Sequence, residues 1–189
     1  MLHTVDKNAA WKKFCSLPEG VSYGAGVLSG DKFYVAGGDT GKGYTNKMWV
    51  LDISGCDGTW VECAPMPGDA RMLPSLTACG KYLYLLGGLA NVSPLMPLPD
   101  IYRYDTEKNE WTRLKDLPFK GYAWASKAID DINILITGRA DGTIHKGIWI
   151  INMQDLSVTE IGELIIQTAT APLVRVSDYT LWVVGGEPD

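Results

Sequence analysis

Runs of apolar residues that end in a pair of glycines recur along the chain and give it a period. The runs lie at residues 35–38, 85–88, 136–139 and 183–186, spaced by about fifty residues, which is typical of propellers and solenoids. In the third run Arg139 replaces the second glycine. Each run follows an apolar stretch that predicts a strand, and the glycines allow the backbone to turn sharply where that strand ends.

Two further segments follow each of the first three runs. The first is aromatic and alternating, closes on Asp or Asn, and lies at residues 49–52, 102–105 and 149–152. The second contains Trp in two copies and lies at residues 59–62, 110–113 and 156–159. Together with the apolar run and the stretch before it, these segments predict four short strands in each period.

The order of these segments resembles the kelch repeat, whose unit is one four-stranded blade of a β-propeller. The resemblance implies an all-β fold of the kelch type, with residues 1–189 forming a single, partial propeller domain. Complete four-stranded blades are expected at about residues 19–66, 68–118 and 119–164. Partial blades are expected at both ends, with the outer strand of a preceding blade in residues 9–18 and the first strands of a further blade in residues 166–189.

The predicted strands stop in the middle of a blade, so the sequence leaves several ways for the ring to close. Kelch rings usually close with about six or seven blades, and the chain is expected to be part of a ring of about six. Two alternatives are a small ring closed by the N-terminal strand and a dimer that completes the ring. In each incomplete arrangement, open blade edges predict self-association through strand pairing.

Composition and charge argue against a membrane-spanning protein, a nucleic-acid-binding protein and a metalloprotein. The chain of 189 residues is 46% hydrophobic and 21% charged, and it contains no apolar run long enough to cross a bilayer. Its 17 basic and 22 acidic residues are interspersed, so no basic surface for nucleic acid is expected. His3 and His145 are the two histidines, and the four cysteines form no closely spaced pair, so no metal site or cofactor is predicted. The first residues lack the apolar core of a signal peptide.

Two families of loops are expected to open on one face of the propeller. Strands within a blade run antiparallel, so the loops that enter the first strand and those that join the second to the third lie at the same end. Functional residues concentrate on loops that a rigid scaffold holds, and a ligand is expected on this face, at the mouth of the central channel. The loops concerned are residues 19–23, 39–46, 68–72, 89–99, 119–122, 139–145, 166–168 and 187–189.

Two stretches of the chain resemble a particular family within the kelch class. Residues 162–188, with Gly186-Glu187-Pro188, and residues 67–88, with Arg71, are similar to the bacterial kelch-type N-acetylneuraminate mutarotases (epimerases). The resemblance implies interconversion of the anomers of sialic acid, a small acidic sugar, without a cofactor. It also implies a catalytic glutamate at Glu187 and a location in the periplasm or otherwise outside the cytoplasm.

Mutarotation explains why these residue types are needed. A carboxyl group can remove the proton of the anomeric hydroxyl and later return one, and Glu187 is the candidate for this role. A guanidinium matches the substrate carboxylate in two hydrogen bonds, which favours Arg71 and, secondly, Arg139. Sugar hydroxyls could bond to further polar side chains, for which the candidates are Asp39, Asn46 and Tyr122.

Each of the charged candidates also has a purely structural interpretation. Glu187 could be a solvated chain end, and Arg71 could pair with Asp69 or cap backbone carbonyls of a neighbouring blade. Arg139 could mark a structural departure of the third repeat from the glycine pair. These alternatives stay open at the level of the sequence.

A binding module without catalysis is the second function class that the sequence supports. Many propellers only present loops to a protein or glycan, and a fold does not by itself decide a function. Residues 92–99 are apolar and rich in proline, and they are long enough to form a contact surface. This loop is therefore the candidate contact region.

Overall fold

The structure is a computed structural model that describes residues 15–55, 58–177 and 180–186. In these residues every regular element is a β-strand, so the predicted all-β class is confirmed. Most strands are short, and the strands that pair within each sheet are antiparallel. The predicted strand in residues 9–18 falls largely outside the described residues.

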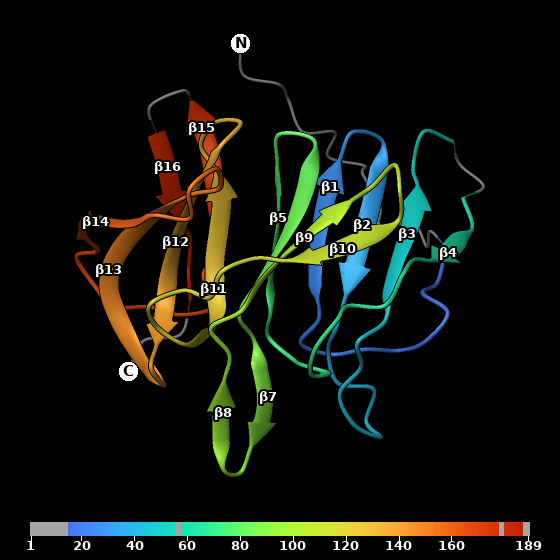
Figure 1. Cartoon of the computed structure of the whole chain (residues 1–189), viewed down its shortest axis with the longest axis horizontal. Coiled ribbons are helices and arrows are strands. Elements are labelled where there is room, and N and C mark those ends of the chain that lie inside the picture. Colours follow the sequence, from blue (N-terminus) through green and yellow to red (C-terminus); the bar gives the residue numbers. More distant parts are fainter. Residues whose placement is uncertain (1–14, 56–57, 178–179, 187–189) are drawn as a thin grey trace, which may run out of the picture.

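Three four-stranded antiparallel sheets form most of the fold (Figure 1). The first sheet contains β1 (Ala25–Ser29), β2 (Lys32–Ala36), β3 (Met48–Asp52) and β4 (Trp60–Glu62). The second contains β5 (Ser75–Cys79), β6 (Tyr82–Leu86), β9 (Ile101–Asp105) and β10 (Glu110–Arg113). The third contains β11 (Gly121–Ala128), β12 (Asn133–Ala140), β13 (Thr143–Asn152) and β14 (Val158–Glu163).

Two smaller hairpins complete the described fold. Strands β15 (Leu173–Ser177) and β16 (Thr180–Val183) pair with each other after the third sheet. Strands β7 (Leu89–Val92) and β8 (Leu95–Pro97) form a hairpin between β6 and β9. This hairpin projects from the lower end of the molecule in Figure 1.

The first strands of successive sheets lie next to one another. Strand β5 contacts β1 on one side and β11 on the other, and β11 also contacts β15. Each sheet therefore continues outward from a shared inner row of first strands. This radial arrangement is that of a propeller, in which sheets surround a common axis.

The hydrophobic core lies between the sheets. The side chains of β6 alternate between the two faces of the second sheet, so they pack against both neighbouring sheets. Leu83 and Leu85 pack in a cluster with residues of the first sheet, including Tyr34 and Met48. Leu86, one position further on, packs in a second cluster with residues of the third sheet. Because both faces are covered, β6 is an almost continuous apolar run, and each fully buried leucine contributes about 1.5–3 kcal/mol.

The glycine pairs end the second strand of a sheet with a repeated backbone conformation. Gly37 and Gly38 have φ angles of 66° and 108°, and Gly87 and Gly88 have 54° and 115°. In the third sheet, β12 instead continues through Arg139 to Ala140, and a tight turn leads directly into β13. Arg139 therefore replaces a glycine where the strand does not have to turn.

Two glycines with nearly equal φ angles provide a matched test of this packing. Gly87 (φ 54°) and Gly30 (φ 56°) both adopt a left-handed conformation. A Cβ at Gly87 would lie 2.4 Å from the carbonyl oxygen of Gly121, whereas a Cβ at Gly30 meets nothing within 4 Å. We expect Gly30→Ala to cost about 1–2 kcal/mol from backbone conformation alone. Gly87→Ala should cost about 1–3 kcal/mol more, because the backbone must shift.

Urea unfolding followed by Trp fluorescence measures both free energies. Equal losses of stability in Gly87→Ala and Gly30→Ala would contradict the close approach at the glycine pair. A larger loss in Gly30→Ala would contradict it as well.

Candidate functional site

The two families of loops do share one end of the molecule, as the antiparallel order of the strands predicts. Backbone bridges connect a loop that precedes a first strand to a loop that follows a second strand. These bridges are Ser22 to Asp39, Met72 to Leu89 and Leu98 to Gly121. In Figure 1 this end lies at the bottom, where the β7–β8 hairpin projects.

A charged contact also joins the two families of loops in the first sheet. The Nζ atom of Lys47 donates to Oε2 of Glu19 across 3.0 Å. This hydrogen bond, with the charge of Glu19, raises the pKa of Lys47 above its usual value. Both side chains are well exposed, so the contact orients the loops more than it stabilises the fold.

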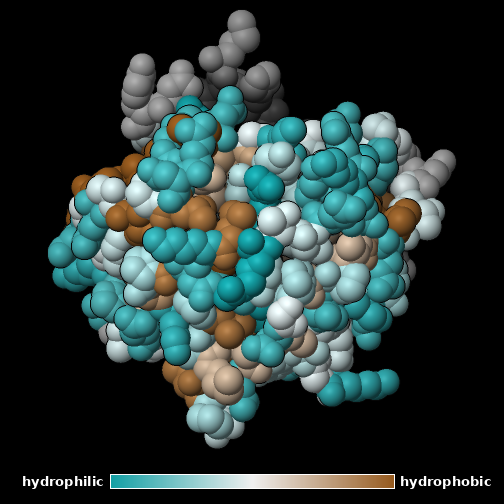
Figure 2. Space-filling view, in the orientation of Figure 1, coloured by the Kyte–Doolittle hydropathy of each residue, from teal (hydrophilic) through white to brown (hydrophobic). Residues whose placement is uncertain are grey.

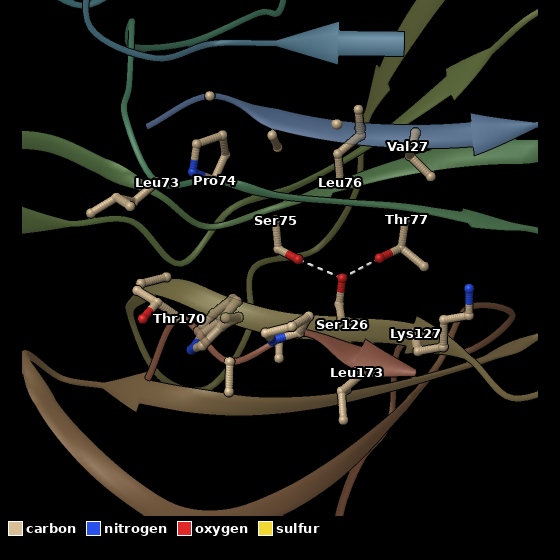
Figure 3. A pocket seen from close by; sticks show the side chains of 18 of the residues that line it. Val27, Leu73, Pro74, Ser75, Leu76, Thr77, Ser126, Lys127, Thr170 and Leu173 are labelled. Carbon is tan, nitrogen blue, oxygen red and sulfur yellow. Dashed lines mark hydrogen bonds between the residues drawn. The ribbon is translucent and has the colours of Figure 1, made fainter. Parts of the chain in front are cut away.

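A hollow of about 650 Å³ lies between the first strands of the sheets, along the expected channel (Figure 3). Its walls come from β1, β5, β11 and the segment 170–173. Most of the lining is apolar or backbone, as with Val27, Leu76 and Leu173. Lys127 is the charged residue of the lining in the described chain.

Three hydroxyl groups from two strands meet in this hollow. Ser126 of β11 lies between Ser75 and Thr77 of β5, as Figure 3 shows. Its Oγ is 2.5 Å from Oγ of Ser75 and also forms a hydrogen bond with Oγ1 of Thr77. Hydroxyls both donate and accept, so this cluster can bond to water or to a polyhydroxylated molecule. No pattern in the sequence marks this cluster, because Ser and Thr within a strand look like ordinary strand residues.

Arg71 is fully buried and paired with a carboxylate. Its Nη1 and Nη2 donate to the two carboxylate oxygens of Asp100 across 2.5 and 3.0 Å. Nη1 also donates to the carbonyl of Gly87, and Nε donates to that of Asp69. The guanidinium lies 5.6 Å from the ring centre of Tyr102.

These contacts place Arg71 inside the second sheet and not on its surface. The side chain joins the loop before β5 to the glycine turn after β6 and to Asp100, just before β9. A bidentate pair of this kind is geometrically specific. The structural interpretations of Arg71 are both corrected: its carboxylate partner is Asp100 and not Asp69, and the carbonyls that it caps, those of Asp69 and Gly87, belong to its own blade and not to a neighbouring one. Binding of a substrate carboxylate by Arg71 stays a prediction.

Tyr122 and Arg139 are brought together by the pairing of β11 with β12. They are direct partners in the sheet, and the guanidinium of Arg139 lies 5.5 Å from the ring centre of Tyr122. Both side chains are half-buried. The carbonyl of Arg139 accepts a hydrogen bond from the indole of Trp124, which fixes the backbone. This pairing places an oriented cation beside an aromatic ring on the loop face.

Asp39 and Asn46 lie on the loop between β2 and β3. Oδ1 of Asp39 accepts from the backbone N–H of Gly41 across 2.8 Å, which stabilises the turn. The carbonyl of Asn46 accepts from the backbone N–H of Met66. In the described chain no hydrogen bond or ring contact links them to Tyr122 or Arg139, although all four lie at the same end. Their predicted contacts with a sugar stay predictions.

Glu187, the predicted catalytic residue, lies outside the described residues. The structure describes the chain up to Gly186 at this end. Gly185 and Gly186 have φ angles of 70° and 101°, close to those of Gly37 and Gly38. The turn before Glu187 thus repeats the conformation of the first glycine pair.

The segment 89–99, expected to be a loop, contains the β7–β8 hairpin instead. Two short apolar stretches flank Ser93 and Pro94, which form its turn. This pattern is a hairpin signal that the prolines obscured, because proline is uncommon in strands. Exposed side chains of Val92, Leu95 and Met96 occupy its tip.

The described residues offer neither a metal site nor a membrane-spanning helix. In the described chain no group of three or more His, Cys, Asp or Glu residues could hold a metal ion. No described helix is long and apolar enough to cross a membrane.

The radial sheets, the shared inner strands and the repeated glycine turns define a β-propeller of the kelch type. The solved structure of YjhT matches this fold with a TM-score of 0.80, covering 92% of this chain and 60% of that one at 18% sequence identity. This likeness concerns the fold alone.

Sequence comparison identifies the family. The sequence profile of the N-acetylneuraminate epimerase family matches residues 14–161. An N-acetylneuraminate epimerase of Vibrio cholerae is 30% identical over 163 residues, which cover 84% of this chain and 40% of the relative. One of Pasteurella multocida is 33% identical over 140 residues, which cover 72% of this chain and 36% of the relative. The chain belongs to the N-acetylneuraminate epimerase family, and it spans about 40% of the length of these relatives.

Proposed function

We propose that the protein containing this chain interconverts the anomers of N-acetylneuraminate. The observation that carries the proposal is the family match, which extends over residues 14–161. The substrate class follows from the names of the relatives, which are N-acetylneuraminate epimerases. The arrangement of loops on one face of the propeller agrees with a site at the mouth of the channel.

The protein has to supply only proton transfers for the proposed reaction. A base removes the proton of the anomeric hydroxyl, the bond between the anomeric carbon and the ring oxygen breaks, and the ring oxygen receives a proton. The open-chain ketone then turns about the adjacent carbon–carbon bond, and the reverse steps close the ring on the other face. We assign the base and acid role to Glu187, since a carboxyl group can perform both steps.

Arg139 is the arginine that we place at the substrate carboxylate. Its guanidinium is held beside Tyr122 on the loop face. Arg71, by contrast, is buried and paired with Asp100. A guanidinium held against an aromatic ring is oriented, and its planar edge suits a carboxylate. Tyr122, Asp39 and Asn46 are proposed to contact sugar hydroxyls.

Anomer exchange measured by proton NMR tests the proposed function. A full-length protein that contains this chain is added to α-N-acetylneuraminate, and the appearance of the β-anomer is followed over time. Equilibration faster than the spontaneous reaction at the same pH supports the proposal. A rate equal to the spontaneous one, with folded protein, refutes it.

A binding module is the second candidate, and the β7–β8 hairpin favours it. The hairpin projects from the loop face, and Figure 2 shows apolar atoms on this projection. Leu95 and Met96 are 47% and 45% exposed. Exposed apolar side chains on a projecting hairpin are typical of a contact surface for a protein.

Removing the apolar tip tests whether the hairpin is part of the sugar site. We expect the double variant Leu95→Ser with Met96→Ser to keep the stability of the wild type within about 0.5 kcal/mol, because the tip is exposed. Anomer exchange should also stay within about twofold, and both quantities are measured by urea unfolding and by NMR. Val61→Ser, on the exposed face of β4, is the matched control. Loss of exchange only in the tip variant would place the hairpin in the sugar site and remove the support for a separate binding surface.

A further inference from the structure

A second hollow, of about 440 Å³, lies at the end of the molecule opposite the candidate sugar site. It is formed by the turn between β5 and β6, the turn between β11 and β12, and the turn after β13. The first two turns are at the top of the view in Figure 1, away from the β7–β8 hairpin. The hollow lies between the second and third sheets.

Two cations in this lining share one aromatic ring. The guanidinium of Arg103 lies 4.6 Å from the ring centre of Tyr82, and Nζ of Lys81 lies 5.1 Å from the same centre. Contact with the face of a ring holds a guanidinium in place without using its N–H groups. The N–H donors of Arg103 are thus left for another partner.

Neither cation has a carboxylate partner in the described part of the chain. The ion pairs found there are Lys47 with Glu19, Arg71 with Asp100 and Arg113 with Asp116. Arg103 is half-buried, in the middle of β9 and opposite Tyr84 of β6. Its N–H groups have no acceptor in the described chain and stay in contact with water, since the buried side-chain polar atom without a partner there is Nε1 of Trp60. They are therefore available to a ligand that enters the hollow.

The acidic residues nearby are mostly engaged in their own turns. The carboxylate of Asp130 accepts from the backbone of Ile132 and Asn133. That of Asp105 accepts from the backbone of Glu107 and Lys108, and these bonds, with the charge of Lys81, lower its pKa. Asp131 also lines the hollow.

The thiol of Cys79 adds no negative charge to the lining. Burial raises its pKa to about 11, with smaller contributions from Asp130 and Asp131. Among the described residues of the lining, the charged side chains are Arg103, Lys81 and Asp131, and the carboxylates of Asp105 and Asp130 lie nearby.

We propose that this hollow binds the carboxylate or phosphate group of a small organic acid, held by Arg103 and Lys81 over Tyr82. A planar guanidinium offers two parallel donors to such an oxyanion, and an ammonium supplies a second charge. Bound there, the anion offsets the repulsion between the two cations. This site is separate from the sugar site, and it does not depend on the proposed function.

An anion bound in this hollow would contact residues of two neighbouring sheets. Arg103 and Lys81 belong to the second sheet, whereas Asp131 and Gln154 of the lining belong to turns of the third. Gly80 and Asp131 already approach closely, since a Cβ at Gly80 would lie 2.9 Å from the carbonyl oxygen of Asp131. An anion in the hollow is expected to stabilise the contact between the two sheets, because it binds the folded form only.

Titration of the 189-residue chain with succinate and with inorganic phosphate tests the proposal. Backbone amide shifts in NMR, at low ionic strength, report binding at residues 80–82 and 131–132. We expect saturable shifts confined to this hollow, with affinity falling as salt is added. Binding of succinate alone assigns a carboxylate ligand, and binding of phosphate alone assigns a phosphate ligand.

Three variants identify the groups responsible. Arg103→Gln should weaken binding by about tenfold or more, and Lys81→Gln, in an exposed turn, by about threefold. Arg113→Gln on the neighbouring strand, outside the lining, is the control and should change binding by less than about twofold. The proposal is overturned if neither probe produces saturable shifts, or if Arg103→Gln and Lys81→Gln both bind like the control. Because Lys81 is exposed, its variant keeps the test valid if Arg103→Gln unfolds.

Discussion

Asp100→Ala is expected to destabilise the chain by about 3–5 kcal/mol. The change leaves the guanidinium of Arg71 buried without its carboxylate, since both side chains are almost inaccessible to water. A buried charge that loses its partner keeps the cost of desolvation and loses the attraction that offset it. Urea unfolding, monitored by Trp fluorescence, measures the loss.

The ion pair between Arg113 and Asp116 supplies the control for this experiment. Its two side chains are 58% and 41% exposed, and its N–O distance is 2.7 Å. Asp116→Ala should cost less than about 1 kcal/mol, because water replaces the lost partner. If Asp100→Ala and Asp116→Ala have the same unfolding midpoint, Arg71 and Asp100 do not support the fold as their geometry indicates.

Glu187→Gln is expected to lower the rate of anomer exchange by about 10²–10⁴-fold in a full-length protein. Glutamine keeps the size of the side chain and can form hydrogen bonds, but it cannot accept and return a proton at neutral pH. The loss should appear in kcat, because the group acts in the proton transfers. Proton NMR of the two anomers measures it under saturating substrate.

Glu160→Gln is the matched control for Glu187→Gln. Glu160 is an exposed carboxylate on the outer strand β14, and its replacement should leave the exchange rate within about twofold. An unchanged rate in Glu187→Gln would remove the proposed role of this residue. Equal losses in both variants would indicate a general effect on the protein and would also count against that role.

The sequence predicts the propeller well because the repeat encodes local geometry. An apolar run, two glycines with positive φ and an aromatic strand are all defined within a few residues, and they recur in register. In the third repeat the sequence departs from this pattern, and the backbone departs from it at the same place. Arg139 stands where a second glycine is expected, and the strand there continues into a tight turn instead of bending outward.

The candidate site was harder to predict, because its contacts join distant parts of the chain. Arg71 and Asp100 are separated by 29 residues, and no local pattern marks them as partners. Ser75 and Ser126 are separated by 51 residues and meet only because β5 and β11 are neighbours. Tyr122 and Arg139, in contrast, are paired by adjacent strands, so a register prediction could have placed them together.

The alternating side chains of β6 determine which part of the protein folds and unfolds as one cooperative unit. Side chains of β6 pack in a hydrophobic cluster on each face of the second sheet. The second sheet therefore has no core that belongs to it alone. The cooperative unit is then the interface between neighbouring blades, and stability accumulates interface by interface, as in other repeat proteins. Hydrogen exchange in β6 should accordingly be slower than in β16, whose side chains are largely exposed. Gene duplication can lengthen such an array by whole blades, because each added blade brings one new interface with it.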